Sequence, residues 1–220
     1  MTGNTHFSLG VAAGAAAVAF NGTADDVGAC VAAVMVSSLG SLLPDIDEDG
    51  SMLNNLLFRS IKYRSAALSV LGAITALLGI VNGLDLWIIL AGIYAMVVAF
   101  IPHRSFTHSL LSLGIVSGIT YLAAPDYVLP MAAGYLSHLL ADAITSAGIP
   151  IFWPWKKRIG TKNLGFSVRS GDTFDKVTGK VGMYGGCLAM IYMLLNGASY
   201  DDFFQTAREQ LETVKGLFKS

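Results

Sequence analysis

The chain has 220 residues, of which 54% are hydrophobic and 13% are charged, and its formal net charge is −1. Soluble domains average about 25% charged residues, so this composition excludes a protein whose whole surface faces water. The mean hydropathy of +0.59 favours a multi-pass membrane protein instead.

Seven apolar stretches follow one another along the chain, and we expect each of them to form a membrane-spanning helix. Several are shorter than the roughly 20 residues needed to cross a hydrocarbon core of about 30 Å, but flanking small polar and aromatic residues would lengthen most of them. We therefore predict an all-α, polytopic transmembrane helical bundle of about seven spans, with a range of six to eight. The stretches are 7–20, 27–43, 66–84, 86–101, 110–124, 127–141 and 181–195.

Three further segments complete the predicted organisation. Residues 1–6 contain no Lys or Arg, whereas a secretory signal begins with basic residues, so we expect the first apolar stretch to be retained. Residues 48–65 carry leucines at helical spacing, which predicts a short amphipathic segment. Residues 1–198 are expected to form one transmembrane domain, and 199–220 an amphipathic C-terminal tail at the membrane interface.

Basic residues are concentrated on one side of this predicted topology. With seven spans, the connections 44–65, 102–109 and 142–180 lie on the side of the N-terminus, and they hold eleven of the 14 Lys and Arg residues. The connections on the opposite side hold none. By the positive-inside rule the N-terminal side is cytoplasmic, which predicts a multi-pass protein of a bacterial or archaeal-type cytoplasmic (inner) membrane. The eleven residues are Arg59, Lys62, Arg64, Arg104, Lys156, Lys157, Arg158, Lys162, Arg169, Lys176 and Lys180.

All four histidines and three aspartates fall at the cytoplasmic ends of the predicted spans. Ionisable groups next to hydrocarbon are costly and are therefore candidates for function. Polar residues without a common role would divide between the two sides of the membrane, so this convergence predicts one polar site at the cytoplasmic end of the bundle. The candidate metal ligands are His6, Asp45, Asp47, His103, His108, His138 and Asp142.

One pair of these residues has the spacing of paired ligands on a helix. His138 and Asp142 are four positions apart, so one helical face would present both side chains to the same point. Taken alone the pair is ambiguous, because a histidine also forms a hydrogen bond with an aspartate at this spacing without any metal.

A second pair follows a proline. Asp45 and Asp47 come directly after Pro44, and in extended backbone residues two apart point the same way. They would then offer two hard oxygen ligands to a divalent cation. The alternative is a solvated acidic turn, which we favour for the next two residues, Glu48 and Asp49.

A third candidate motif consists of two histidines with an arginine between them. His103 and His108 are separated by a segment that follows a proline, so we expect a turn leading into the next span, with Ser105 or Thr107 capping that helix. Arg104 lies between the histidines, where it is well placed to hold an anion. Histidines at a membrane edge are otherwise often merely interfacial.

Imidazoles and carboxylates without a candidate thiolate suit Zn, Mn or Fe better than a soft-metal or Fe–S centre. We expect Zn or Mn, either as one ion with outer-shell residues or as two ions about 3.5–4 Å apart. Such an ion activates a bound water near neutral pH, so hydrolysis is the reaction that follows most directly. Asp47 or Asp142 would act as a general base instead of a ligand.

The same residues resemble the YdjM-like family of LexA-binding, inner-membrane-associated metal-dependent hydrolases. The resemblance covers roughly residues 1–170 and implies a multi-pass inner-membrane protein with metal-dependent hydrolase activity. It also implies an association with LexA, for which the residues themselves give no evidence. The matching elements are His6, Leu43-Pro-Asp-Ile-Asp47, His103-Arg-Ser-Phe-Thr-His-Ser109 and His138-Leu-Leu-Ala-Asp142, followed by Thr145, Gly148 and Trp153-Pro154.

We therefore expect a membrane-embedded hydrolase that acts on a phosphoester or a lipid-linked phosphate at the cytoplasmic membrane surface. A site beside the headgroup layer favours lipids as substrates over soluble metabolites. Basic side chains would neutralise the phosphate charge: Arg104, with one or more of Lys156, Lys157, Arg158 and Arg169.

Two other functions fit the same pattern. A divalent-cation transporter would use polar ligands within a bundle, but it would also need ionisable groups at the midplane and on the opposite side, where the acids are confined to loop tips. A non-catalytic membrane scaffold would use the metal structurally and would dock a cytoplasmic partner through its basic connection.

Overall fold

The computed structural model describes residues 1–21, 26–48, 50–57, 64–102, 104–155, 157–161 and 168–196. Within these ranges the chain is helical, and a single isolated bridge between Ile149 and Ile159 is the one element of extended pairing. The α-helices are α1 (Gly3–Asn21), α2 (Val27–Leu42), α3 (Met52–Leu57), α4 (Arg64–Val81), α5 (Leu86–Val98), α6 (Leu110–Ala123), α7 (Val128–Ala143) and α8 (Thr173–Asn196). Three short 3-10 helices, η1 (Leu43–Asp47), η2 (Phe106–His108) and η3 (Pro125–Tyr127), join them.

The all-α class predicted from the sequence is confirmed. Each of the seven apolar stretches lies on one of the longer helices, and α3 lies within the predicted amphipathic segment. Two described segments have the length and hydropathy of a membrane span, Val27–Asp47 and Thr173–Leu195. Shorter apolar helices occupy Ser65–Val81, Leu86–Val98 and Leu110–Ala123, so the count of seven spans stays a prediction. The predicted tail at 199–220 lies outside the described residues.

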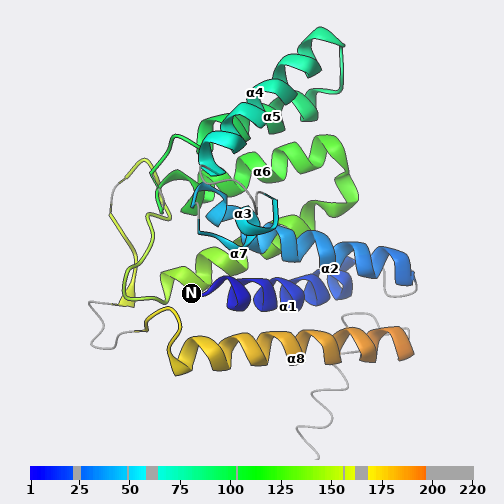
Figure 1. Ribbon diagram of the computed structural model, residues 1–220. Helices are drawn as coiled ribbons and strands as arrows, with labels where there is room; N and C mark the ends of the chain where they lie inside the picture. Colours follow the sequence, from blue (N-terminus) through cyan, green and yellow to red (C-terminus); the bar gives the residue numbers. More distant parts are fainter. Residues whose placement is uncertain are drawn as a thin grey trace, which may run out of the picture.

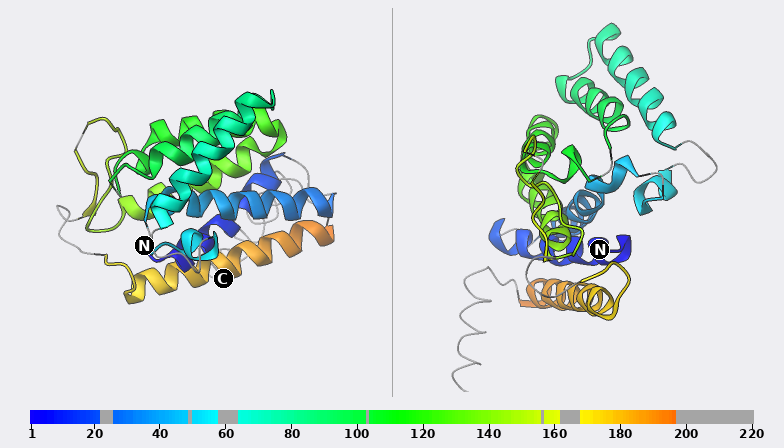
Figure 2. Two further views of the ribbon diagram at one scale, coloured as in Figure 1. Left: turned by 45° about the horizontal axis from the view of Figure 1, so that its top comes forward. Right: turned by 90° about the vertical axis from the view of Figure 1, so that its left-hand side faces the viewer.

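The longer helices are stacked in an order that differs from their order in the chain. α1 packs against α2, α7 and α8, while α6 lies between α7 and α5. The α4–α5 hairpin forms the edge of the stack opposite α8 (Figure 1). Both views of Figure 2 keep this order, with α4 and α5 farthest from α8.

Glycines allow α1, α2 and α7 to approach one another closely. A Cβ atom on Gly134 of α7 would lie 1.9 Å from the backbone oxygen of Ser37, and one on Gly40 of α2 would lie 2.7 Å from the backbone oxygen of Met131. Gly10 of α1 is equally tight against α2. Small residues at helix contacts are typical of membrane bundles, where van der Waals packing drives association. This packing holds the C-terminal end of α2 directly beside α7.

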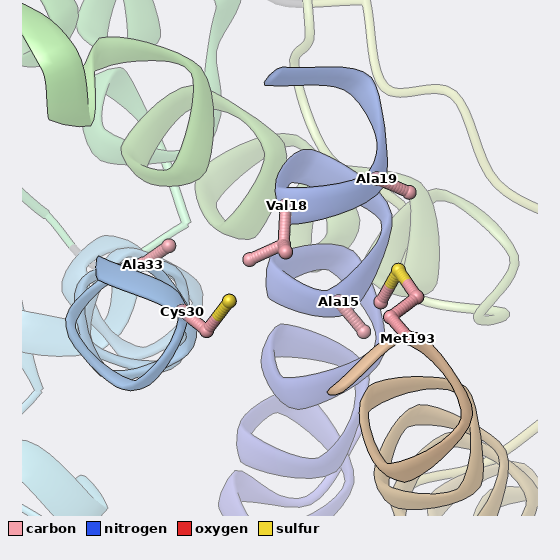
Figure 3. Packing of buried hydrophobic residues seen from close by; sticks show 6 residues of the cluster. All are labelled: Ala15, Val18, Ala19, Cys30, Ala33 and Met193. Carbon is pink, nitrogen blue, oxygen red and sulfur yellow. The ribbon is translucent and has the colours of Figure 1, made fainter. Parts of the chain in front are cut away.

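A small apolar cluster fixes the other ends of α1 and α2. It draws on α1, α2 and α8, and its side chains interlock between the three helices (Figure 3). Cys30 is fully buried in this cluster, in the role of a small hydrophobic side chain that its position in an apolar stretch predicts. Because α1 and α2 run in opposite directions, anchoring these ends sets the start of α1 beside the end of α2. The cluster consists of Ala15, Val18, Ala19, Cys30, Ala33 and Met193.

Candidate metal centre

Five of the seven predicted ligands come together at one end of the bundle, each from the end of an element. His6 lies in the first turn of α1, Asp45 lies on η1 after α2, and His108 lies on η2 before α6. His138 and Asp142 lie near the end of α7. The side chains of the three histidines and Asp142 are at most 1% exposed, whereas the side chain of Asp45 is 18% exposed.

The turn that carries Asp45 differs from our expectation. Extended backbone at 45–47 is wrong, because residues 43–47 form a 3-10 helix with Pro44 near its start. The fixed φ of proline suits the first turn of a helix, and at three residues per turn side chains two positions apart point to different sides. Asp45 therefore faces the histidines, whereas Asp47 accepts a hydrogen bond from the Thr107 hydroxyl at 2.8 Å.

At the centre of the cluster, two imidazole nitrogens each lie within 3.9 Å of an oxygen of Asp45 and of an oxygen of Asp142. The Nε2 atoms of His108 and His138 are 3.2 Å apart. Oδ1 of Asp45 lies 3.4 Å from Nε2 of His108 and 3.7 Å from Nε2 of His138. Oδ2 of Asp142 lies 3.7 Å and 3.9 Å from the same two nitrogens. Two ligands on a tetrahedral ion with bonds of about 2.0–2.1 Å are separated by about 3.3 Å, so the two nitrogens and either one of the two carboxylate oxygens have roughly the spacing of three ligands on such an ion.

Hydrogen bonds fix which ring nitrogen of each histidine carries a proton. Nδ1 of His138 lies 2.7 Å from the backbone oxygen of Ser41, and a carbonyl only accepts, so Nδ1 donates. Nδ1 of His108 lies 3.0 Å from the Thr107 hydroxyl, which already donates its proton to Asp47 and therefore accepts from His108. In the neutral form of each ring, Nε2 is left with a lone pair.

Two lone pairs that face each other at 3.2 Å repel, and a cation between them removes the repulsion. A single shared proton would satisfy the two nitrogens, but carboxylate oxygens of Asp45 and Asp142 also lie within 3.9 Å of both and add negative charge that favours a divalent ion. Oδ2 of Asp142 is buried and makes no hydrogen bond among the described residues, although Nη2 of Arg104 lies 3.4 Å from it. The residues therefore fit a divalent metal ion, with outer-shell bonds that orient the imidazoles in the usual way.

His6 lies beside this set of four atoms. Its ring stacks on that of His138 with centroids 3.7 Å apart and planes 15° from parallel, and its Nε2 lies 3.2 Å from Oδ1 of Asp142. Neither ring nitrogen of His6 has a hydrogen-bond partner among the described residues. His6 also forms a second potential ligand group with Asp45 and His138. However, Nε2 of His138 has one lone pair and binds an ion in only one of the two groups.

Positive groups lie next to Asp142. Nη2 of Arg104 is 3.4 Å from Oδ2 of Asp142, and the amino group of Met1 contacts Oδ1. Arg104 adopts a φ of 55°, a left-handed conformation that costs energy in residues other than glycine and is concentrated at functional sites. Nη2 of Arg158 donates to the backbone oxygen of Arg104 at 3.5 Å, so two arginines meet at the edge of the site.

The remaining predicted residues are less closely connected to the site. His103 and Lys156 lie outside the described residues. Lys157 and Arg169 are exposed, and the backbone N–H of Arg169 donates to Asp172 at 3.0 Å. Backbone N–H groups of Asp175 and Arg169 bind the Asp172 carboxylate and lower its pKa below the ordinary value.

Several supporting residues were not predicted from the sequence. Tyr135 donates its hydroxyl hydrogen to the backbone oxygen of Thr107 and bonds to Ser112, which in turn bonds to Tyr94. This chain of hydroxyls holds the η2 turn that presents His108. Ser109 caps α6 by accepting from the N–H of Ser112, in place of the two residues that we had expected as caps. The hydroxyl groups of the motif at 103–109 indicated that hydrogen bonds would support this turn. Their connection to Tyr94 on α5 and Tyr135 on α7 could not be predicted, because these tyrosines are distant in the sequence.

These observations define an all-α protein with a buried histidine and aspartate centre that fits a divalent ion. A family model described as "YdjM inner membrane protein" matches residues 1–200, so the chain belongs to the YdjM family of inner membrane proteins. This confirms the family resemblance and places the protein in the inner membrane.

Two curated relatives carry the same name. The proteins called "Inner membrane protein YdjM" of Escherichia coli (strain K12) and Shigella flexneri are each 44% identical to this chain over 66 residues. The match covers 26% of this chain and 34% of each relative, which is about a third of the length of those proteins. No solved structure matches the chain.

Proposed function

We propose that this protein is a metal-dependent hydrolase that cleaves a phosphoester or a lipid-linked phosphate at the cytoplasmic surface of the inner membrane. The observation that carries the proposal is that two imidazole nitrogens 3.2 Å apart each lie within 3.9 Å of two carboxylate groups, with an arginine at the edge of the site. A buried site of this kind with only a structural role would have no use for an arginine held in a strained conformation beside the ligands.

Nε2 of His108 and of His138, with a carboxylate oxygen of Asp45 or of Asp142 as third ligand, would hold one divalent ion, Zn or Mn. Mixed nitrogen and oxygen ligands suit both metals, and three protein ligands would leave a fourth position open for water, as in catalytic zinc sites. When bound, the ion would activate water for attack on the phosphoester. Thr107 and the carbonyl of Ser41 keep the two imidazoles in the tautomer that presents Nε2 to the ion.

Arginines would bind the phosphate group of the substrate. Arg104 is 23% exposed, and its guanidinium lies next to Asp142, so the same side chain reaches both the metal ligands and the solvent-facing edge. Arg158, which contacts the backbone of Arg104, adds a second charge there. Arginine pairs with phosphate through charge-assisted hydrogen bonds, and positive groups aimed at developing negative charge stabilise a transition state.

His6 is the best placed of the described residues to receive the proton that water loses. It is stacked on a ligand histidine, its Nε2 lies 3.2 Å from Oδ1 of Asp142, and its Nδ1 has no hydrogen-bond partner among the described residues. Asp47, one of the two general bases expected from the sequence, instead accepts the hydrogen bond from Thr107. In this arrangement Asp47 orients His108, and His6 moves the proton.

The decisive experiment measures metal content and turnover on the same purified protein. The full chain in detergent, loaded with Zn²⁺ or Mn²⁺, is incubated with a panel of phospholipids and polyprenyl phosphates, and released phosphate or headgroup is measured. We expect one equivalent of metal per chain and turnover of at least one lipid class. The His108→Ala variant is the inactive control, and Leu78→Ala on the α4–α5 hairpin is the control for handling.

The alternatives make different predictions in the same experiment. Tight metal binding without turnover of any lipid contradicts the hydrolase and favours a scaffold with a structural metal. Uptake of Mn²⁺ into proteoliposomes that His108→Ala abolishes, without turnover, also contradicts the hydrolase and favours a transporter.

A further inference from the structure

A polar cavity and an apolar groove lie next to each other beside the candidate metal centre. The polar cavity has a volume of about 380 Å³, and Asp45, Glu48 and Asn4 contribute to its lining. The apolar groove has a volume of about 520 Å³ and is lined by side chains of α1, α2 and α3. Met52 and Asn55 belong to the lining of both, so the two hollows share a wall. One of the candidate metal ligands, Asp45, lies at the polar end of this path.

The apolar groove continues onto an exposed stripe of α2. Leu39 lines the groove, and Met35 and Val31 follow it at intervals of four residues toward the start of the helix; all three are exposed. Residues four apart lie on one face of a helix, and the segment Val27–Asp47 has the length and hydropathy of a membrane span. In a bilayer this stripe faces lipid chains.

The wall between the cavity and the groove is fastened to the turn that carries Asp45. The fully buried Asn54 of α3 donates from its side-chain amide to the backbone oxygens of Ile46 and Glu48, each at 2.7 Å. These bonds direct the side chains of Met52 and Leu56 outward, where both are exposed. A Cβ atom on Gly3 would lie 3.1 Å from the Cβ of Met52, so Met52 rests on the start of α1. Methionine is unbranched and adapts its shape to a neighbour.

We propose that an acyl chain of the substrate lies in the groove formed by Phe7, Leu39, Leu42, Met52 and Leu56, with the glycerol part of the headgroup in the polar cavity and the phosphoester beyond it, between Asp45 and Arg104. The inference rests on the proposed function, because it names the substrate as a lipid whose chain enters from the bilayer along α2. A water-soluble phosphoester would need the polar cavity alone. The chain is already out of water in the membrane, so the groove mainly positions the ester and adds little affinity.

Photo-cross-linking tests the position of the chain without any need for turnover. The full-length protein in phosphatidylglycerol vesicles is mixed with a trace of phosphatidylglycerol that carries a diazirine on one acyl chain, then irradiated, digested and mapped by mass spectrometry. We expect adducts at 39–42 and 52–56 to exceed those in the apolar hollow between α5 and α6 by at least about fivefold. That hollow, of about 440 Å³, is similarly apolar and is lined by Leu90, Val97, Ile119 and Leu122, which makes it an internal control.

Groove-filling variants sharpen the test. Leu39 and Leu56 are 46% and 73% exposed, so Leu39→Trp and Leu56→Trp fill the groove without disturbing a buried core. We expect each to reduce labelling at 39–42 and 52–56 severalfold, whereas Leu78→Trp on α4, at a residue that is 52% exposed, leaves it unchanged. Equal labelling of both hollows, or no effect of the tryptophans, overturns the proposal.

The two proposals fail in different ways. Labelling of the groove with no hydrolysis of any lipid refutes the hydrolase and keeps the lipid site. Turnover of glycerol phosphate as fast as that of the lipid, with no selective labelling, refutes the acyl-chain site and keeps the hydrolase.

Discussion

The α1–α2–α7 region and the α4–α5 hairpin are both packed through glycines, yet they differ in what the packing encloses. In the hairpin, a Cβ atom on Gly72 would lie 2.6 Å from the backbone oxygen of Gly92, which is as tight as most contacts between α2 and α7. The residues at 65–81 and 86–98 include no charged side chain and no histidine, and most large side chains there are exposed. Close helix packing by itself therefore does not make a site.

The difference lies in the ends of the helices. The α1–α2–α7 region brings together the first turn of α1, the last turns of α7 and the η1 turn that follows α2, and each of these carries an ionisable residue. Burying carboxylates without a counter-charge is costly; Arg104 and the amino group of Met1 supply part of that charge at Asp142, and a bound divalent ion would supply the rest. Residues 65–81 and 86–98 of the hairpin carry no charged group, so they need no counter-charge and only lipid or neighbouring helices around them.

The largest effect is expected from removing a central imidazole. His138→Ala deletes one of the two facing nitrogens, so metal affinity should fall by more than the roughly 10–100-fold that loss of an outer-shell partner costs. Elemental analysis of the purified variant measures the metal content, and circular dichroism checks that the helices persist. Full metal content in His138→Ala would show that the two facing imidazoles do not hold the ion. Leu78→Ala, in the hairpin, should bind metal like the parent.

Two glycine variants separate packing from metal binding. Gly134→Ala places a Cβ 1.9 Å from the backbone of Ser37, so α2 and α7 must move apart; overpacking of this kind costs up to about 3 kcal/mol in the free energy of unfolding. Gly72→Ala should cost a similar amount in the hairpin. Only Gly134→Ala should weaken metal binding, because His138 shares its helix.

Denaturant unfolding in detergent and metal titration measure both effects. Gly118→Ala serves as the matched control, since nothing lies within 4 Å of its Cβ position, and replacing glycine by alanine in an open helical position should be neutral or stabilising by up to about 1 kcal/mol. If Gly72→Ala weakened metal binding as much as Gly134→Ala, the two regions would be coupled and the comparison would fail.

Much of this comparison was predictable from the sequence, because apolar stretches locate helices and their polar ends can be assigned to one side of a membrane. The meeting of His6, Asp45, His108, His138 and Asp142 follows that assignment. The directions of individual side chains did not follow from it. Pro44 starts a 3-10 turn instead of interrupting a helix, which separates Asp45 from Asp47. The bond from His138 to the carbonyl of Ser41 has no signature in the sequence, since every residue carries a carbonyl.

Variants of Thr107 test whether the hydrogen bond between its hydroxyl group and Nδ1 of His108 sets the tautomer of that histidine. Thr107→Val removes the hydroxyl that links His108 to Asp47 while keeping the side-chain shape, so metal affinity should fall by about 10–100-fold. Thr107→Ser restores the hydroxyl and should restore most of the affinity. A titration with Zn²⁺ against a chelating dye measures it. Equal affinity in Thr107→Val and the parent would mean that Asp47 and Thr107 do not orient the ligand.

The smallest effect is expected at the end of α2 that lies away from the site. Asp26 caps α2 by accepting hydrogen bonds from the N–H groups of Gly28 and Ala29 at 2.8 Å and 3.1 Å. Asp26→Ala should therefore lower the free energy of unfolding by about 1 kcal/mol, with metal affinity unchanged because the apolar cluster of α1, α2 and α8 separates this cap from η1.

Asp26→Asn keeps an oxygen that accepts these bonds but removes the charge, so it should retain most of the stability. A loss in Asp26→Asn as large as that in Asp26→Ala would assign the effect to the charge at the helix N-terminus instead of the hydrogen bonds. A fall in metal affinity in either variant would show that the two ends of α2 are coupled through the helix.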